Sequence, residues 1–415
     1  MRVLVAAFSH IFAEIVDPTG LFTDSRGLTR DTYAIKKELP AEDFNFVVLG
    51  DWGGLPPPAY TSELQLNGAK ALMEYAKINP PEYVLSIGDH FYYNGVETVR
   101  DRAWERTFEN VYDSQEMMVP WYPTMGNHDW LKLPEGTEGG QKGNGWAQIE
   151  YSAHGTGRWT HPDLFFTTEY TTSAGIKVKT ILVDTPTLTG EYRDGAPRPI
   201  HSDENCDDPY NLDCELRALH PLDEEIAEWA WEWVEQELAN SGDADYLFVT
   251  GHYMILDTGG IYDWELFRRL EPLMEQYKVS AFFQGHKHTQ EHAVRSPKLV
   301  PAGAEETPGT VHFFTTGAGS LYDTESTIFQ QLTGGFPGRS GCHPRFEENG
   351  NDNSRTVCHY YWATTKNDGE ADSGFTSVNI SADRAQVRFV TSEKINEDDK
   401  FSIGYEFDIP PRNVQ

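Results

Sequence analysis

Five strand-like hydrophobic runs in this sequence end in a glycine that is followed by a possible metal ligand. The first two runs end in Gly-Asp, the third in Gly-Asn-His, and the last two in Gly-His. A single Asp after a strand commonly caps a turn, but turn capping does not account for five such endings in one chain. Glycine lets neighbouring backbones approach closely, as a compact metal cluster requires. The polar residues at or just after these endings are Asp51, Asp89, Tyr92, Asn127, His128, His252, His286 and His288.

The donor atoms in this set are carboxylate, phenol, amide and imidazole groups, with no thiolate. Such donors suit hard or borderline ions such as Fe, Mn and Zn. The His-x-His pair at 286 and 288 places two imidazoles on one loop, where they could face two adjacent ions. The sequence therefore predicts a metal cluster.

The first elements that must position these residues alternate between strands and helices. Strands are predicted at 44–50, 82–89 and 119–127, and helices at 61–78 and 99–112. A βαβαβ order implies a mostly parallel sheet covered by helices, with its functional sites at the carboxyl ends of the strands. The polar residues would then share one crevice.

The second half of the chain is predicted to add further strands and one strong helix. The helix, 222–238, has an apolar stripe of Ile226, Trp229, Trp233 and Val234, which we expect to pack in the core rather than bind sugar or membrane. The strands are predicted at 175–185, 246–251, 279–285 and 311–319, and a closing hairpin at 374–393. Insertions are predicted near 131–147, 186–221 and 321–372.

The chain of 415 residues has 65 acidic and 33 basic residues, giving a net charge of −32. Such a charge disfavours nucleic acid as a partner and is consistent with solubility. An anionic substrate would need a local positive charge, which a metal cluster supplies. No apolar run is long enough to span a membrane.

Four cysteines form two close pairs, Cys206/Cys214 and Cys342/Cys358. They suggest two local disulfides and an oxidising compartment, either extracellular or resembling a lysosome or vacuole. The Cys-His dipeptides at 342 and 358 leave a small metal site open as an alternative, and free thiols are a third. Asn379 lies in a glycosylation sequon, and residues 1–12 resemble a degraded signal peptide.

The ordered blocks "GDWGG", "GDHFYYNGV", "VPWYPTMGNHD", "GHYMI" and "GHKH" resemble those of the metallophosphoesterase superfamily. More closely, they resemble the small, tartrate-resistant type of purple acid phosphatase, over about Phe44 to Val390 without the insertions. The resemblance implies an α/β fold, a four-layer αββα sandwich of two mixed sheets flanked by helices. The catalytic domain would span 43–395, with an N-terminal extension at 1–42 and a C-terminal tail at 396–415.

The family also implies a ligand set for two ions that are bridged by Asp89. Tyr92, three residues after the second Asp, would ligate Fe(III) as a phenolate, whereas Tyr93 is expected to pack. The Fe(III) site would consist of Asp51, Asp89, Tyr92 and His288. The second site, for Fe(II), Zn or Mn, would consist of Asp89, Asn127, His252 and His286.

The implied activity is hydrolysis of phosphate monoesters, with a metal-bound hydroxide attacking phosphorus in line. His128 would orient the phosphate or protonate the leaving group, and Asp129 would either orient His128 or cap a helix or turn. Small phosphorylated molecules and, second to these, phosphoproteins are the expected substrates, and the protein is expected to be a monomer. A phosphodiesterase or nucleotide phosphohydrolase, or a non-catalytic iron-binding or redox protein, remain alternatives.

The sequence departs from the family at one active-site position. A second histidine usually follows the "GHY" histidine by about nine residues, and here Asp257 or Tyr262 could lie in its place. His292 is expected to be a solvated residue without a role. The 186–221 insertion lies where the small enzymes have a repressive loop, so we expect it to gate activity.

Overall fold

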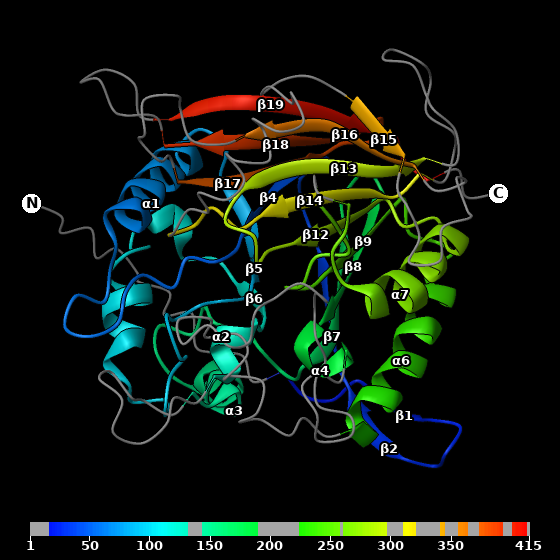
Figure 1. Cartoon of the computed structure of the whole chain (residues 1–415), viewed down its shortest axis with the longest axis horizontal. Coiled ribbons are helices and arrows are strands. Elements are labelled where there is room, and N and C mark those ends of the chain that lie inside the picture. The colour runs from blue at the N-terminus through cyan, green and yellow to red at the C-terminus, as the bar shows by residue number, and fades with distance from the viewer. Residues whose placement is uncertain are drawn as a thin grey trace, which may run out of the picture.

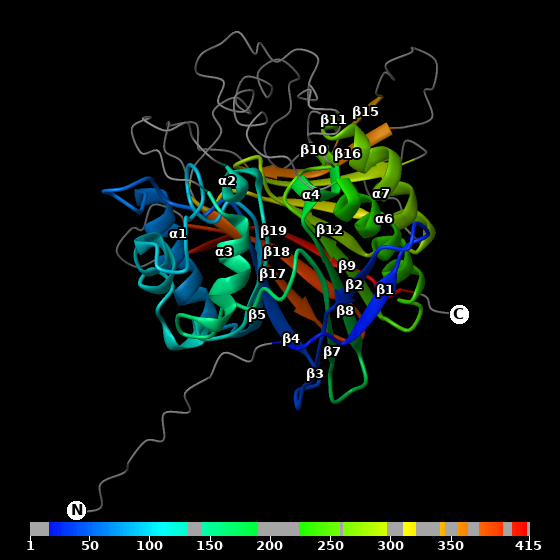
Figure 2. The same ribbon diagram turned by 90° about the horizontal axis from the view of Figure 1, so that it is seen from below.

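Two β-sheets lie face to face, and helices cover their outer faces (Figures 1 and 2). The molecule is therefore the predicted α/β sandwich of four layers, with α1 on one side and α6 and α7 on the other. The computed structural model describes residues 16–131, 143–189, 224–257, 260–296, 310–320, 341–344, 356–363, 373–392 and 401–412.

The six-stranded sheet has the order β19-β18-β17-β4-β5-β6. Its parallel half is formed by β4 (Phe44–Leu49), β5 (Pro81–Ile87) and β6 (Trp121–Thr124). Its antiparallel half is formed by β17 (Gly374–Ile380), β18 (Ala385–Thr391) and β19 (Ser402–Ile409). The predicted βαβαβ order and closing hairpin are both confirmed here.

The nine-stranded sheet has the order β15-β16-β13-β14-β12-β9-β8-β7-β3. Its parallel centre runs through β8 (Lys177–Val183), β9 (Tyr246–Thr250), β12 (Ala281–Gln284) and β14 (His312–Thr316). The flanking strands are β3 (Ala34–Glu38), β7 (Phe165–Thr171), β13 (Gln290–Ser296), β15 (Gly341–Pro344) and β16 (Thr356–Ala363). Two small hairpins are β1 (Gly20–Thr23) with β2 (Thr29–Thr32), and β10 (Leu256–Asp257) with β11 (Gly260–Ile261).

The helices differ widely in length. The long ones are α1 (Glu63–Ala76), α6 (Glu224–Ala239) and α7 (Trp264–Gln276), and the short ones are α2 (Asn127–Trp130), α3 (Gly145–Glu150) and α4 (Thr185–Thr189). A π-helix, Trp104–Glu109, occupies part of the helix predicted at 99–112, and 3₁₀ turns lie at Gln115–Met117 and Tyr151–Ala153. Among the described residues, none of the helices is long and apolar enough to cross a membrane.

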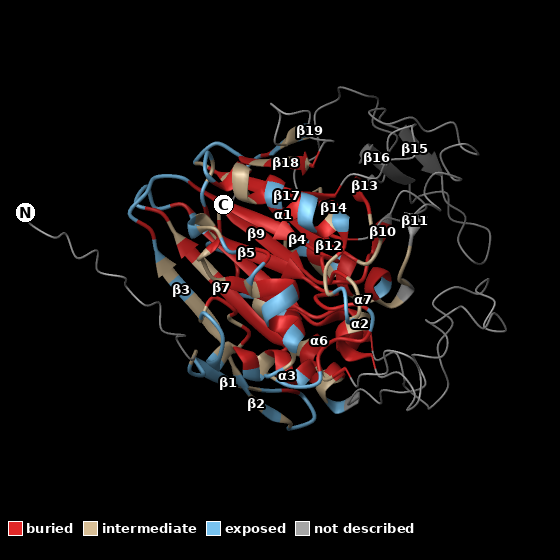
Figure 3. Ribbon diagram, turned by 90° about the vertical axis from the view of Figure 1, so that its left-hand side faces the viewer, coloured by how far each residue is buried: buried red, intermediate tan, exposed pale blue. Residues whose placement is uncertain are grey.

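The central strands are largely apolar on both sides because both faces of each sheet are covered. In β4, Phe46 and Val48 belong to the cluster between the two sheets, whereas Val47 and Leu49 belong to the cluster beneath α1. Figure 3 shows the same pattern, with β4, β9 and β12 buried throughout. The tryptophan stripe of α6 is buried against the nine-stranded sheet, so its predicted core role is confirmed.

The segments predicted as an N-terminal extension and a C-terminal tail each supply an edge strand of a sheet. β3 lies within the predicted extension and pairs in parallel with β7. β19 lies within the predicted tail and pairs antiparallel with β18. Both strands are partly exposed, which explains their weak hydrophobic pattern.

The modification predictions remain untested. β15 and β16 pair with Cys342 directly opposite Cys358 in the backbone register. The side chains of these two residues lie outside the described part of the chain, as do Cys206 and Cys214 and most of the three insertions, including the proposed gating segment. Asn379 lies within β17, between β4 and β18.

We predict that Phe248→Ala destabilises the protein by about 3–5 kcal/mol, because it opens a cavity between the sheets. The Phe248 ring packs 5.7 Å from the Phe46 ring and 5.4 Å from the Phe283 ring, measured between centroids. Denaturant unfolding of the variant measures the loss. Ile78→Ala is the control, because Ile78 is 69% exposed and its truncation should cost less than about 0.5 kcal/mol. Equal losses in both variants would contradict the packing that we describe.

Candidate metal centre

The predicted ligands converge at the carboxyl ends of five parallel strands. They follow β4, β5 and β6 of one sheet and β9 and β12 of the other. The six-stranded sheet supplies the oxygen donors Asp51, Asp89, Tyr92 and Asn127, and the nine-stranded sheet supplies the imidazoles of His252, His286 and His288.

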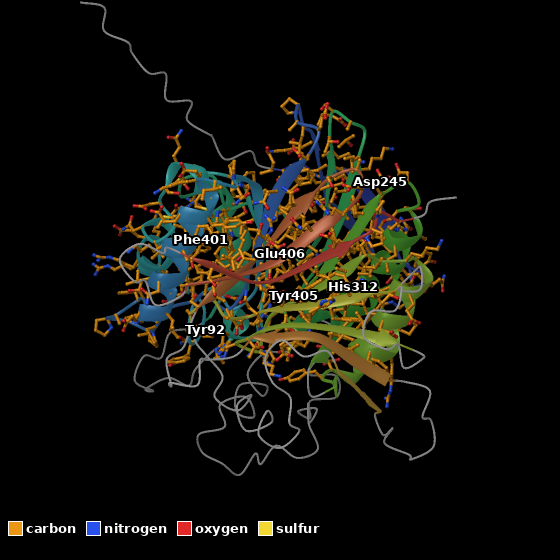
Figure 4. All side chains as sticks on the ribbon, turned by 90° about the horizontal axis from the view of Figure 1, so that it is seen from above. Tyr92, Asp245, His312, Phe401, Tyr405 and Glu406 are labelled. Atoms are coloured by element: carbon orange, nitrogen blue, oxygen red, sulfur yellow. The ribbon has the colours of Figure 1, made fainter. Side chains whose placement is uncertain are left out.

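One group of donors gathers around the Tyr92 phenol, whose residue is labelled in Figure 4. Its hydroxyl lies 2.8 Å from His288 Nε2, 3.2 Å from Asp89 Oδ2 and 3.4 Å from Asp51 Oδ1. One ligand atom each from Asp51, Asp89 and His288 lies within 4.8 Å of the others, close enough to hold a metal ion.

A second group gathers around the Asn127 amide. Its Oδ1 lies 3.0 Å from both His252 Nε2 and His286 Nδ1, and these two nitrogens are 3.3 Å apart. Asp89, His252 and His286 form the second set of residues with ligand atoms within 4.8 Å of one another.

Asp89 belongs to both groups, and its two carboxylate oxygens face different partners. Oδ1 lies 3.4 Å from His252 Nε2, whereas Oδ2 lies 3.2 Å from the Tyr92 hydroxyl. Two oxygens that are directed at two donor groups match the geometry of a bridging carboxylate.

The backbone at the ligands is strained and crowded. Asp51, Asp89 and His286 have φ values of 57°, 53° and 70°, a region that non-glycine residues seldom occupy and that is concentrated at functional sites. A Cβ atom at Gly126 would collide with the Asp89 carboxylate, and one at Gly88 would collide with the His252 ring. The glycines therefore permit the close approach that the sequence predicted.

Burial and neighbouring charges shift the pKa values of the acidic groups of the site in opposite directions. Burial raises the pKa of Asp51 more than its histidine neighbours lower it. Burial also raises the pKa of Asp89, but His252 and His128 outweigh it and bring the pKa well below its usual range. Burial and the two carboxylates raise the pKa of the Tyr92 phenol. Two buried carboxylates and a phenol thus require nearby positive charge.

The imidazoles respond to the same field in opposite directions. Burial lowers the pKa of His252, yet Asp89 and Asp51 more than compensate and raise it to about 10. Burial and the charge on His252 lower the pKa of His286 well below its usual value. Metal ions would replace the protons that otherwise balance the negative charge of this site. The oxygen and nitrogen donors, with no sulfur, fit a pair of hard or borderline ions.

Outer hydrogen bonds fix which nitrogen each histidine presents. His252 Nδ1 lies 2.9 Å from the Ile87 carbonyl, so Nε2 faces the cluster. His286 Nε2 lies 2.8 Å from the Tyr262 hydroxyl, so Nδ1 faces it. Of the two residues considered in place of the absent second histidine, Tyr262 therefore contacts a candidate ligand. The side chain of Asp257 lies outside the described part.

His128 lies at the exposed side of the centre, next to Asp89. Its Nδ1 contacts the Tyr93 carbonyl oxygen at 2.5 Å, and because a carbonyl only accepts, Nδ1 holds a proton. Its Nε2 lies 4.0 Å from Asp89 Oδ2, and its main-chain N–H donates to Asp89 Oδ1 at 3.0 Å.

Asp129 is buried and forms hydrogen bonds with the backbones of two ligand loops. Its carboxylate accepts from the N–H groups of Gly126 at 2.9 Å and His90 at 3.0 Å. It also accepts from Gln148 Nε2 at 2.8 Å, and Gln148 Oε1 contacts His90 Nδ1 at 2.8 Å. These contacts favour the capping alternative for Asp129. His90 and Gln148 could not be identified from the sequence, since only the fold brings them to Asp129.

One expectation about a neighbouring residue is wrong. His292 is fully buried rather than solvated, with Nε2 3.0 Å from His312 Nδ1 and Nδ1 2.8 Å from the Tyr405 hydroxyl. Figure 4 labels His312 and Tyr405, which come from β14 and β19. Tyr93 was expected to pack, and its ring does lie against those of Tyr92 and His128, although the residue is 37% exposed.

Asp184 forms hydrogen bonds with a helix next to the site. It is buried between α2 and α4, where Oδ2 accepts from the Trp130 indole at 3.1 Å and Oδ1 from the Thr187 main chain at 2.8 Å. Burial raises the pKa of Asp184 to about 6, despite these hydrogen bonds. The adjacent Thr185 hydroxyl accepts from the main-chain N–H groups of His252 and Tyr253.

Two mixed sheets between helices, with clustered metal donors at the strand ends, define a metallophosphoesterase architecture. The chain belongs to the calcineurin-like phosphoesterase family, whose model matches residues 44–290.

The curated relatives of the chain are acid phosphatases, in agreement with the resemblance that its motifs predicted. It is 28% identical over 296 residues to tartrate-resistant acid phosphatase type 5 of Homo sapiens, covering 70% of this chain and 77% of that protein. It is 26% identical over 299 residues to purple acid phosphatase 7 of Arabidopsis thaliana, covering 71% and 75%.

Solved structures share the fold. GAP50, the anchor in the inner membrane complex of Plasmodium, aligns with a TM-score of 0.58 and 20% identity over 90% of each chain. Purple acid phosphatase PPD1 from yellow lupin aligns with a TM-score of 0.52 and 14% identity, covering 94% of this chain and 58% of that one.

We predict that Asp129→Asn lowers metal affinity about 10–100-fold, as substitutions of residues that support metal ligands by hydrogen bonds typically do. An amide cannot accept all three hydrogen bonds without bringing its own N–H₂ group against a donor. Chelator competition measures the affinity, and circular dichroism checks the fold. Asp31→Asn, at an exposed position of β2, is the matched control. Unchanged affinity in the Asp129 variant would show that the two loops do not depend on this carboxylate.

We predict that Asp184 makes the protein less stable as pH rises from about 4 to about 6. Its folded-state pKa of about 6 exceeds its ordinary value of 3.8, so the folded state binds more protons in this range. The loss amounts to about 3 kcal/mol above pH 6. Asp184→Asn removes this contribution, so the stability of the variant relative to the parent should rise by that amount between pH 4 and 7. Parallel stability curves for the two proteins would contradict this assignment.

Proposed function

We propose that this protein is an acid phosphatase that hydrolyses phosphate monoesters at a binuclear metal centre. The observation that supports this most strongly is the placement of Asp89, whose two oxygens face the Tyr92 group and the His252 group separately. The relatedness of the chain to acid phosphatases supports the same reaction class.

The charges of the two donor groups support different ions. Asp51, Asp89 and a Tyr92 phenolate would give the first site three anionic ligands, joined by His288, which suits Fe(III). Asn127, His252 and His286 are neutral ligands and share only the Asp89 charge, which suits a divalent ion such as Fe(II), Zn or Mn. When bound, such a pair supplies positive charge to the phosphate oxygens and activates water as the nucleophile.

We assign His128 the proton transfer to the leaving group. The Tyr93 carbonyl holds the proton at Nδ1, which leaves Nε2 to protonate the ester oxygen or to orient the phosphate. Asp129 positions the backbones around Asp89 and Asn127. Tyr262 keeps the His286 ring oriented through its hydroxyl.

The substrates that we propose are small phosphorylated molecules and, second to these, phosphoproteins. All seven proposed ligands come from one chain, so a monomer suffices for the site. The paired cysteines support an extracellular compartment or one resembling a lysosome or vacuole.

Metal analysis and a visible spectrum of the purified protein test this proposal. We expect one or two iron ions per chain and a broad band in the green-yellow region from phenolate-to-iron charge transfer. Activity without iron or colour would instead indicate a Zn or Mn phosphoesterase. Faster hydrolysis of bis(p-nitrophenyl) phosphate than of p-nitrophenyl phosphate would favour a phosphodiesterase. Iron without any hydrolysis would favour a redox or iron-binding role.

We predict that Asp89→Asn removes activity and bound metal together. Loss of the shared ligand should lower metal affinity by more than the ~100-fold that is typical of substitutions of residues that support the ligands by hydrogen bonds. Metal content per chain and p-nitrophenyl phosphate turnover are measured in parallel, with Asp31→Asn as the control. Full metal content in the Asp89 variant would be incompatible with a bridging role.

A further inference from the structure

Within the part of the chain that the structure describes, the candidate centre has its open side at His128 and His288, and a phosphate ester is expected to enter there. Asp51, Asp89 and Tyr92 are buried, whereas His128 and His288 keep 17% and 16% of their side chains exposed. The organic part of a bound ester therefore has to project past the exposed residues.

Tyr93 lies on this open side, next to His128. Its residue is 37% exposed, compared with 4% for its neighbour Tyr92. The Tyr93 ring centroid lies 6.3 Å from the His128 ring and 5.8 Å from the Tyr92 ring, at interplanar angles of 53° and 51°. A partly exposed aromatic ring thus stands beside the imidazole that we assign to the leaving group.

The backbone of Tyr93 links this ring to the proposed proton transfer. Its carbonyl oxygen holds His128 Nδ1 at 2.5 Å, which fixes where Nε2 points. If Nε2 delivers a proton to the ester oxygen, the group bonded to that oxygen lies on the same side as the Tyr93 ring. One residue then orients the acid through its carbonyl and faces the leaving group with its side chain.

We propose that Tyr93 is a specificity-determining residue whose ring packs against the leaving group and favours aromatic over small aliphatic phosphate esters. This inference rests on the proposed phosphatase function and on the role of His128. Contact between two aromatic rings should favour the aromatic ester by about two- to tenfold over an ester that lacks a ring.

The test compares kcat and KM for phenyl phosphate and ethyl phosphate in the parent, Tyr93→Leu and Tyr93→Phe. Both variants keep the carbonyl that orients His128. We expect Tyr93→Leu to lower the phenyl-to-ethyl ratio of kcat/KM about two- to tenfold, and Tyr93→Phe to keep the parent ratio. The two esters differ in leaving-group chemistry, but that difference is the same in every variant and cancels from the comparison.

A second measurement separates contact from damage to the site. The inhibition constants of phenylphosphonate and ethylphosphonate should change their ratio in Tyr93→Leu in the same direction. A general disturbance of the site would lower kcat/KM for both esters by the same factor and weaken the binding of both phosphonates by the same factor. Either that result or an unchanged phenyl-to-ethyl ratio overturns the proposal. An equal fall of the phenyl-to-ethyl ratio in Tyr93→Phe would show that the hydroxyl, and not the ring, determines the preference. That result would also overturn the proposal. If the parent hydrolyses neither ester, the phosphatase function itself fails, and the role of Tyr93 fails with it.

Discussion

The face-to-face packing of the two sheets is the constraint on which the rest of the structure depends. Phe46 of one sheet meets Phe248 and Phe283 of the other, and the surrounding side chains are almost fully buried. This contact brings the carboxyl ends of β4, β5 and β6 next to those of β9 and β12. The proposed oxygen ligands come from the first sheet and the imidazoles from the second, so neither sheet alone contains the centre.

That division gives the site its electrostatic character. The carboxylates of Asp51 and Asp89 are brought out of water by the same packing that places His252 against them, and the raised pKa of His252 records the attraction. Positive charge is needed wherever such anions are buried. Metal binding and sheet packing are therefore expected to stabilise each other, because ions that bind only the folded state shift the equilibrium toward it.

Much of this arrangement could be predicted from the sequence, because its signals are local. The buried strands are largely apolar runs, and each Gly-ligand ending marks a strand end where close approach is needed. The contacts behind the ligands could not be predicted, because Asp129, His90 and Gln148 meet only in the folded chain. His292 was misjudged for a related reason. β19, with Tyr405 and Phe407, covers it, and the sequence had assigned that segment to a tail. Tyr93 follows a candidate ligand directly, and spacing alone could not show that its ring faces outward.

The proposed centre requires that two ions share Asp89. Anomalous diffraction from crystals of the iron-loaded protein, measured above and below the iron edge, tests it most directly. We expect two metal positions about 3.5–4 Å apart, one beside Tyr92 and His288 and the other beside Asn127 and His252, with Asp89 contacting both. A single position, or two positions without Asp89 between them, would contradict it.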